Sequence, residues 1–137
     1  MANTYYLEIF TPDKSFFSDD VEELLINTPS GQIGILKSHM PMVAAVSIGT
    51  ISIKINGEWK DAVLSEGFME IIKDKVVVLV DTAEWPEEID INRAKRAEER
   101  ARERLSSKIN RMEYAYSQAA LQKAIIRIKA YSGKNKN

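Results

Sequence analysis

The chain has 137 residues, of which 45% are hydrophobic, enough for one ordinary domain or a small domain with an appendage. It lacks a run of about eighteen apolar residues, so we expect no transmembrane span, and its first residues lack the regions of a secretion signal. With no Cys and one His, disulfides and thiolate chemistry are excluded and a zinc site is disfavoured.

The charge is divided unevenly along the chain. Residues 1–89 contain six Lys and no Arg against fifteen acidic residues, a net charge of −9. Residues 90–137 contain thirteen basic residues against five acidic ones, a net charge of +8, and all seven arginines lie between Arg93 and Arg127. Solvated helix faces favour Arg and Lys, but that preference does not explain the absence of Arg from the first part. The division indicates two parts with different partners.

The first part predicts short strands joined by turns. Residues 51–55 alternate with a period of two, and Asn56-Gly57 behind them is a strong hairpin signal. The apolar run at residues 76–80 predicts a strand buried on both faces. We expect Ser18-Asp19-Asp20 to separate two strands and Gly67 to mark a bulge. The expected strands lie at residues 5–10, 14–17, 21–27, 51–55, 59–66, 68–72 and 76–80.

Between them, residues 28–50 (TPSGQIGILKSHMPMVAAVSIGT) are too dense in Gly and Pro for a helix. Their short apolar runs predict strands, with Gly31, Gly34 and Gly49 at turns or bulges.

The period becomes helical after Pro86. Asp90 is a candidate N-cap for a first helix, and Asn110, with Glu113 three residues later, predicts a second helix start. We expect Gly133 and the polar tail to end the chain. The apolar stripe of each predicted helix consists mostly of Ala. The stripe of the first helix is residues 91, 94, 97, 101 and 105, and that of the second is residues 115, 119, 120, 124, 125 and 128. Such a seam buries little area, which suits a hairpin that changes conformation, although a static hairpin is the alternative.

These patterns predict an α+β chain. Residues 1–86 form an antiparallel β-sandwich or flattened barrel, and residues 87–137 form an antiparallel two-helix hairpin.

The residues Gly31-x-x-Gly34-x-Leu36-x-x-His39-x-Pro41, followed by Gly49-x-Ile51, resemble the epsilon subunit of bacterial F-type (rotary, proton-translocating) ATP synthases, the delta subunit of mitochondria. The resemblance covers nearly the whole chain. It implies a non-catalytic central-stalk subunit, peripheral on the cytoplasmic side of the cell membrane, which reaches the membrane only through its complex. The implied partners are the gamma subunit, the ring of c subunits and the catalytic alpha and beta subunits. It also implies that the helices inhibit ATP hydrolysis.

The resemblance carries over to particular residues. It implies that Gly31, Gln32, Ile33 and His39 face the ring and gamma, although a lone His is more often a turn residue. Ile89-Asp90-x-x-Arg93-Ala94 resembles a motif with which some members bind ATP as a regulator. The implied nucleotide-binding residues are Glu84, Ile89, Asp90, Arg93, Ala94, Arg100, Lys123 and Arg127.

The residue chemistry permits this assignment, since paired guanidiniums suit triphosphate oxygens. Arg93 and Arg100 lie seven residues apart, on one helical face. Spacing alone favours the plainer interpretation, in which Asp90 is an N-cap and Arg93 its i+3 partner. Together with the resemblance, ATP binding is favoured. Lys123 stands where the family often has Arg, and a Lys lacks the bidentate fork.

Two further function classes stay open. Thirteen basic residues in the second part would also suit a nucleic-acid-binding module, but the acidic first part and the lack of a reading helix disfavour it. A small enzyme is disfavoured because the motifs of P-loops, serine hydrolases and zinc proteases are absent. No metal or other cofactor is expected to be required.

Overall fold

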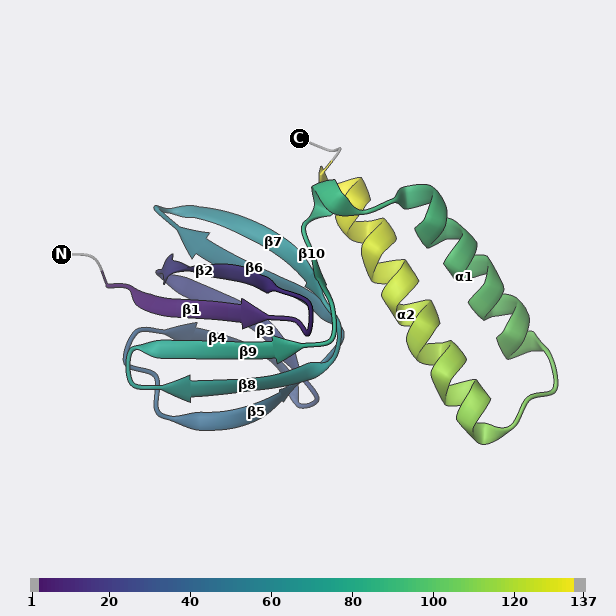
Figure 1. The fold of residues 1–137 in the computed structure, drawn as a ribbon, viewed down its shortest axis with the longest axis horizontal. Helices are drawn as coiled ribbons and strands as arrows, with labels where there is room; N and C mark the ends of the chain where they lie inside the picture. The colour runs from purple at the N-terminus through teal and green to yellow at the C-terminus, as the bar shows by residue number, and fades with distance from the viewer. Residues whose placement is uncertain (1–2, 135–137) are drawn as a thin grey trace. The chain divides into compact units, whose positions relative to one another are not determined.

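The computed structural model describes residues 3–134, and the chain divides into two compact units between Glu84 and Trp85 (Figure 1). The first unit is a sandwich of two five-stranded sheets. The second unit is a hairpin of two helices. The predicted fold class, a β-sandwich followed by a helical hairpin, is confirmed.

The ten strands of the first unit are β1 (Tyr5–Phe10), β2 (Ser15–Val21), β3 (Glu23–Thr28), β4 (Gly31–Leu36), β5 (Met42–Val46), β6 (Gly49–Ile55), β7 (Glu58–Leu64), β8 (Gly67–Ile72), β9 (Lys75–Val80) and β10 (Ala83–Glu84). The first sheet has the order β2-β1-β9-β8-β5, and the second has the order β10-β7-β6-β3-β4. The pairing of β1 with β9 is parallel, the one departure from the predicted antiparallel pattern among the described strands.

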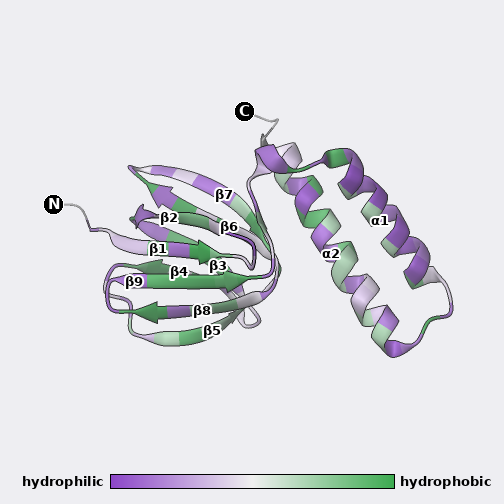
Figure 2. Cartoon of the chain, in the orientation of Figure 1, coloured by the Kyte–Doolittle hydropathy of each residue, from purple (hydrophilic) through white to green (hydrophobic). Residues whose placement is uncertain are grey.

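The core lies between the two sheets and follows from the alternation of side chains along each strand. Leu7, Ile9 and Val78 of the first sheet are fully buried, as are Leu24, Ile51 and Ile53 of the second. Figure 2 shows the strongest hydrophobic colouring along β9. The period-two segments of the sequence therefore do supply the core, as predicted.

One predicted turn is instead part of a strand. Asp19 and Asp20 lie within β2, opposite Leu7 and Tyr6 of β1, and both are exposed. β2 is the edge strand of its sheet, where charged side chains are tolerated and discourage pairing with other chains. The acidic pair is therefore an edge feature rather than a break.

The predictions of bulges at glycines were wrong. Gly31 does occupy a turn, with φ at +122°, but Gly34, Gly49 and Gly67 lie in register within strands. A Cβ at Gly67 would meet the Leu79 carbonyl oxygen and lie 2.7 Å from Val80 Cα. Gly67 is thus needed for a close backbone approach between β8 and β9.

The second unit begins with a short 3-10 helix, η1 (Pro86–Glu88), followed by α1 (Ile91–Ser106) and α2 (Arg111–Lys134). Both predicted starts are confirmed. Asp90 caps α1, and the Glu113 backbone N–H donates to Asn110 Oδ1 at 2.8 Å before α2. Gly133 lies within α2 rather than ending it, and residues 135–137 of the predicted tail lie outside the described residues.

The seam between α1 and α2 consists of small residues. Ala94 and Ala101 of α1 and Ser117 and Ala124 of α2 are buried. Ala115, which the sequence pattern placed in the stripe, is exposed instead. Ser117 was missed because a hydroxyl does not count as apolar in a periodicity argument.

We expect residues 1–86 to fold without the hairpin, because the buried hydrophobic residues of the sandwich all lie on its own strands. A chain ending at residue 86 should give one cooperative thermal transition, followed by circular dichroism, with the full chain as reference. A broad, non-cooperative melt of the shortened chain would contradict this expectation.

Candidate functional site

The predicted nucleotide-binding residues begin at the N-terminus of α1. Asp90 Oδ1 accepts a hydrogen bond from the Arg93 backbone N–H at 3.1 Å, and its carbonyl oxygen accepts from the Ala94 N–H at 3.0 Å. The cap occupies one carboxylate oxygen, so the same side chain can cap the helix and accept from a ligand. Ile89 and Ala94 are buried beside it and shape the site rather than present polar groups.

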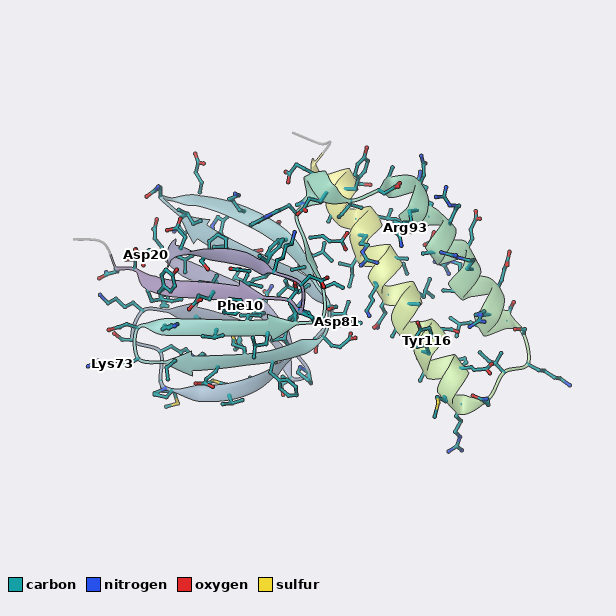
Figure 3. All side chains as sticks on the ribbon, in the orientation of Figure 1. Phe10, Asp20, Lys73, Asp81, Arg93 and Tyr116 are labelled. Carbon is teal, nitrogen blue, oxygen red and sulfur yellow. The ribbon has the colours of Figure 1, made fainter. Side chains whose placement is uncertain are left out.

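The basic residues of this prediction come from both helices. Arg93 projects from the first turn of α1 and is exposed, as is Arg100 about two turns further on (Figure 3). Lys123 and Arg127 lie one turn apart on α2 and are partly buried, each with interactions of its own.

The antiparallel hairpin places the C-terminal half of α2 beside the start of α1 (Figure 1). It therefore brings Asp90, Arg93, Lys123 and Arg127 to one end of the seam. Arg100 lies nearer the middle of the seam, and Glu84 belongs to β10 of the sandwich unit. No described contact tests nucleotide binding, which stays a prediction.

The predicted partner-binding residues do not form one patch. Gly31, Gln32 and Ile33 begin β4, whereas His39 follows its other end. Leu36 lies five residue steps beyond Gly31 along the strand, or about 17 Å at the usual rise. If both groups contact partners, they do so at opposite ends of this strand.

The loop that carries His39 is held by short-range contacts. The His39 backbone N–H donates to the Leu36 carbonyl at 3.2 Å, and His39 Nδ1 lies 2.9 Å from the Met40 carbonyl oxygen. Ser38 has a positive φ of 69°, typical of a tight turn. These contacts indicate a structural role for the ring in the loop.

The start of this loop is anchored to the sandwich by a buried phenol. The Tyr5 hydroxyl donates to the Ile35 carbonyl at 2.6 Å. Burial raises the pKa of Tyr5, and the nearby Glu23 carboxylate raises it further. The folded protein therefore holds this phenol neutral and hydrogen-bonded.

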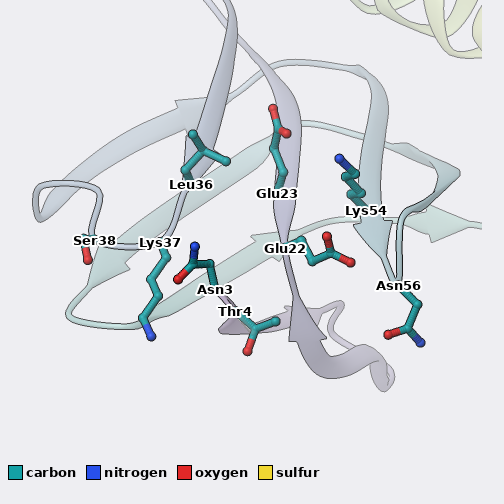
Figure 4. A pocket seen from close by; sticks show the side chains of 9 residues that line it. All are labelled: Asn3, Thr4, Glu22, Glu23, Leu36, Lys37, Ser38, Lys54 and Asn56. Atoms are coloured by element: carbon teal, nitrogen blue, oxygen red, sulfur yellow. The ribbon is translucent and has the colours of Figure 1, made fainter. Parts of the chain in front are cut away.

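An open groove of about 720 Å³ runs beside the same loop (Figure 4). Glu22, Glu23, Lys37 and Lys54 give it both signs of charge, and the Glu22 carboxylate accepts from the Gly57 N–H at 2.8 Å. Its mixed charges do not converge on one point in Figure 4, so it has no evident ligand class.

Within residues 3–134, no cluster of three or more His, Cys, Asp or Glu side chains could hold a metal ion.

The sequence argument missed an exposed apolar surface on the first sheet. We call it the outer apolar face; its members are Phe10, Val43, Ala45, Phe68, Val77 and Leu79, and the exposed Glu70 lies between Val43 and Val77. One row crosses four strands, because Phe10 pairs with Leu79, Leu79 with Phe68, and Phe68 with Ala45. Phe68 is 64% exposed and Val43 is 70% exposed. An exposed apolar row of this kind marks an interaction site.

The signal for this face was present in the run Val76–Val80. That run predicted burial on both sides, but the structure exposes 54% of Leu79. A strand that is apolar on both faces needs a cover on each, and the sandwich unit covers β9 fully on one face alone. The prediction was therefore wrong for the isolated chain, and the uncovered face is a candidate partner surface.

No helix within residues 3–134 is long and apolar enough to cross a membrane.

Comparison with known proteins matches both units. Residues 4–86 match the family model of the ATP synthase delta/epsilon chain beta-sandwich domain, and residues 87–132 match that of its long alpha-helix domain. The ATP synthase epsilon chain of Ruminiclostridium cellulolyticum is 50% identical over 127 residues, covering 93% of this chain and 95% of that one. That of Caldanaerobacter subterraneus subsp. tengcongensis is 48% identical over 133 residues, covering 96% of each.

A solved structure shares the fold at lower identity. A chain of the Euglena gracilis mitochondrial ATP synthase, in an assembly described as OSCP/F1/c-ring, superposes with a TM-score of 0.80 at 21% identity. The match covers 97% of this chain and 82% of that one.

We predict that Tyr5→Phe lowers the stability of the chain at pH 7 by about 1 kcal/mol, because it removes a buried hydrogen bond. The raised pKa favours the neutral phenol in the folded state, so its stabilising effect is present below the ordinary Tyr pKa of about 10 and is lost as the pH rises above it. Denaturant unfolding between pH 7 and pH 11 should therefore show the two proteins converging. A constant difference across this range would contradict the assignment.

Proposed function

The chain belongs to the ATP synthase delta/epsilon chain family, and on that premise we propose that it is the non-catalytic epsilon subunit in the rotor of a bacterial F-type ATP synthase. The observation that carries the proposal is the match of both units, in order, over nearly the whole chain. In this role it couples proton-driven rotation to ATP synthesis. It reaches the cytoplasmic side of the cell membrane through the complex.

The proposed partners are the gamma subunit, the c-ring and the catalytic alpha and beta subunits. The outer apolar face supports a permanent contact with gamma, since several exposed large side chains line one flat sheet surface. Glu8 and Lys75 pair at 2.8 Å beside it and would add polar complementarity at its rim. The loop around His39, or the opposite end of β4 at Gly31, would serve the c-ring.

The hairpin would inhibit ATP hydrolysis when it extends along gamma towards the catalytic subunits. The net charge of +8 on residues 90–137 supports contact with an acidic surface there. Its small-residue seam supports a change of conformation, because an Ala seam buries few of the methylenes that contribute about 0.8 kcal/mol each. The same positive charge is the sole feature that would suit a nucleic-acid-binding module, and the family match does not favour that alternative.

ATP is the proposed regulator. Asp90, Arg93 and Arg100 come from α1, and Lys123 and Arg127 come from α2, so a ligand that needs both groups binds the closed hairpin. A ligand shifts a conformational balance through its differential affinity for the two states. ATP would therefore favour the closed, non-inhibiting hairpin, by about 2.7 kcal/mol at a hundredfold excess over Kd.

We expect deletion of residues 90–137 to raise ATP hydrolysis by the assembled complex while assembly persists. The reason is that the sandwich keeps the outer apolar face, whereas the inhibitory hairpin is gone. The measurement is steady-state hydrolysis by purified complexes with the full and the shortened chain. Equal hydrolysis rates for the two complexes at several ATP concentrations would contradict the inhibitory role without affecting the family assignment.

We expect the double substitution Asp90→Ala, Arg93→Ala to abolish ATP binding by the isolated chain in calorimetry. Lys123→Arg should tighten binding, because a bidentate fork replaces a point charge. Asp90→Ser is the matched control for folding, since Ser is also a good N-cap but lacks the carboxylate. If the double variant binds ATP like the parent chain, these residues are helix-capping and surface residues only.

A further inference from the structure

A second feature of the hairpin lies along its seam, towards the loop that joins the helices. It is a groove of about 400 Å³ between α1 and α2. Its walls combine small apolar side chains with a few polar groups, the composition of ligand pockets. The lining residues are Ala97, Arg100, Ala101, Arg104, Tyr116, Ser117 and Ala120.

Ser117 is the unusual residue of this groove. It is 1% exposed, and its hydroxyl oxygen has no hydrogen-bond partner among the described residues. Buried polar atoms almost always have a partner, so an orphan hydroxyl in a groove wall points to a group absent from the chain itself. The neighbouring buried seam positions Ala94, Ala101 and Ala124 carry no polar atom, so packing alone does not call for a hydroxyl here.

Two guanidiniums lie on the opposite wall. Arg100 and Arg104 are one helical turn apart, both are exposed, and within residues 3–134 neither guanidinium has a hydrogen bond or an ion pair. Arg102, on another face of α1, differs, because it pairs with Glu98 at 3.2 Å. The lining of the groove therefore combines two forks of N–H donors and a buried hydroxyl with no carboxylate.

We propose that this groove binds a phosphate group, held by Arg100, Arg104 and the Ser117 hydroxyl. A phosphate supplies several strong acceptor oxygens, which suits paired guanidiniums and gives the buried hydroxyl an acceptor. Arg104 and Ser117 are not among the nucleotide-binding residues predicted above.

The phosphate has two chemical sources, inorganic phosphate or the polyphosphate chain of a nucleotide. In the first case the proposal does not depend on the proposed ATP regulation. In the second case it rests on the proposed ATP regulation, with Arg100 shared between the two sets of residues.

The test uses the full chain, with inorganic phosphate, pyrophosphate and ATP as separate probes in calorimetry and in amide NMR titrations. Ser117→Ala should fold, because Ala already forms the rest of the seam and favours helix. Ser117→Ala and Arg104→Gln should each weaken binding by about tenfold, as expected for a lost hydrogen bond to a charged group. Arg102→Gln is the matched control, with the same charge change on the same helix, and should change binding less than about twofold.

The source is read from Asp90→Ala, Arg93→Ala. If inorganic phosphate is the ligand, the double variant binds it with the affinity of the parent chain. If the phosphate belongs to a nucleotide, ATP is the only probe that binds the parent chain, and the double variant does not bind it. Undiminished binding in Ser117→Ala, an equal loss in Arg102→Gln, or no saturable binding of any probe overturns the groove as a phosphate site. ATP binding that depends on Asp90 and Arg93 but not on Ser117 overturns this proposal and leaves the regulatory one standing.

Discussion

The parallel pairing of β1 with β9 is the constraint on which the sandwich depends. It joins the first strand of the chain to the last long strand, through register pairs that run from Tyr6 with Lys75 to Phe10 with Leu79. On the inner side it places Leu7 beside Val76 and Ile9 beside Val78, all of them buried. On the outer side it places Phe10 beside Leu79, which extends the outer apolar face across the sheet. One pairing thus builds both the core and the surface that we assign to a partner.

The hairpin is held by a different kind of contact. Its seam of Ala94, Ala101 and Ala124 buries few methylenes, and its Ser117 hydroxyl adds a polar atom without a partner. Both features lower the free energy that separates the closed hairpin from an opened one. A ligand that supplies acceptors at the seam would stabilise the closed state by its own binding free energy. The two units therefore differ in packing, with a firmly packed sandwich and a weakly packed hairpin, which suits the docking and regulatory roles that we propose for them.

Much of the fold follows from local rules that the sequence displays openly. The hairpin at Asn56-Gly57, the caps at Asp90 and Asn110, and the alternating strands need only near neighbours to be recognised. The failures share one cause, which is that they depend on neighbours distant in sequence. Gly67 is required by the backbone of β9, and the acidic pair in β2 is tolerated because that strand is at an edge of its sheet. Leu79 is exposed because the sandwich unit covers only the other face of β9. Ser117 shows the same limit within the site, since only the packed hairpin reveals that its hydroxyl is buried.

The exposure of Leu79 and the burial of Ser117 carry opposite physical meanings. Val76–Val80 is more apolar than the isolated fold requires, and exposed Leu79 and Phe68 gain free energy only when another molecule covers them. Ser117 is more polar than its burial requires, and it gains only when an acceptor reaches it. Each residue is unfavourable in the chain alone and favourable in a larger assembly or with a ligand. Such residues lower the stability of the free subunit, but they increase the free energy that it gains on binding within a complex.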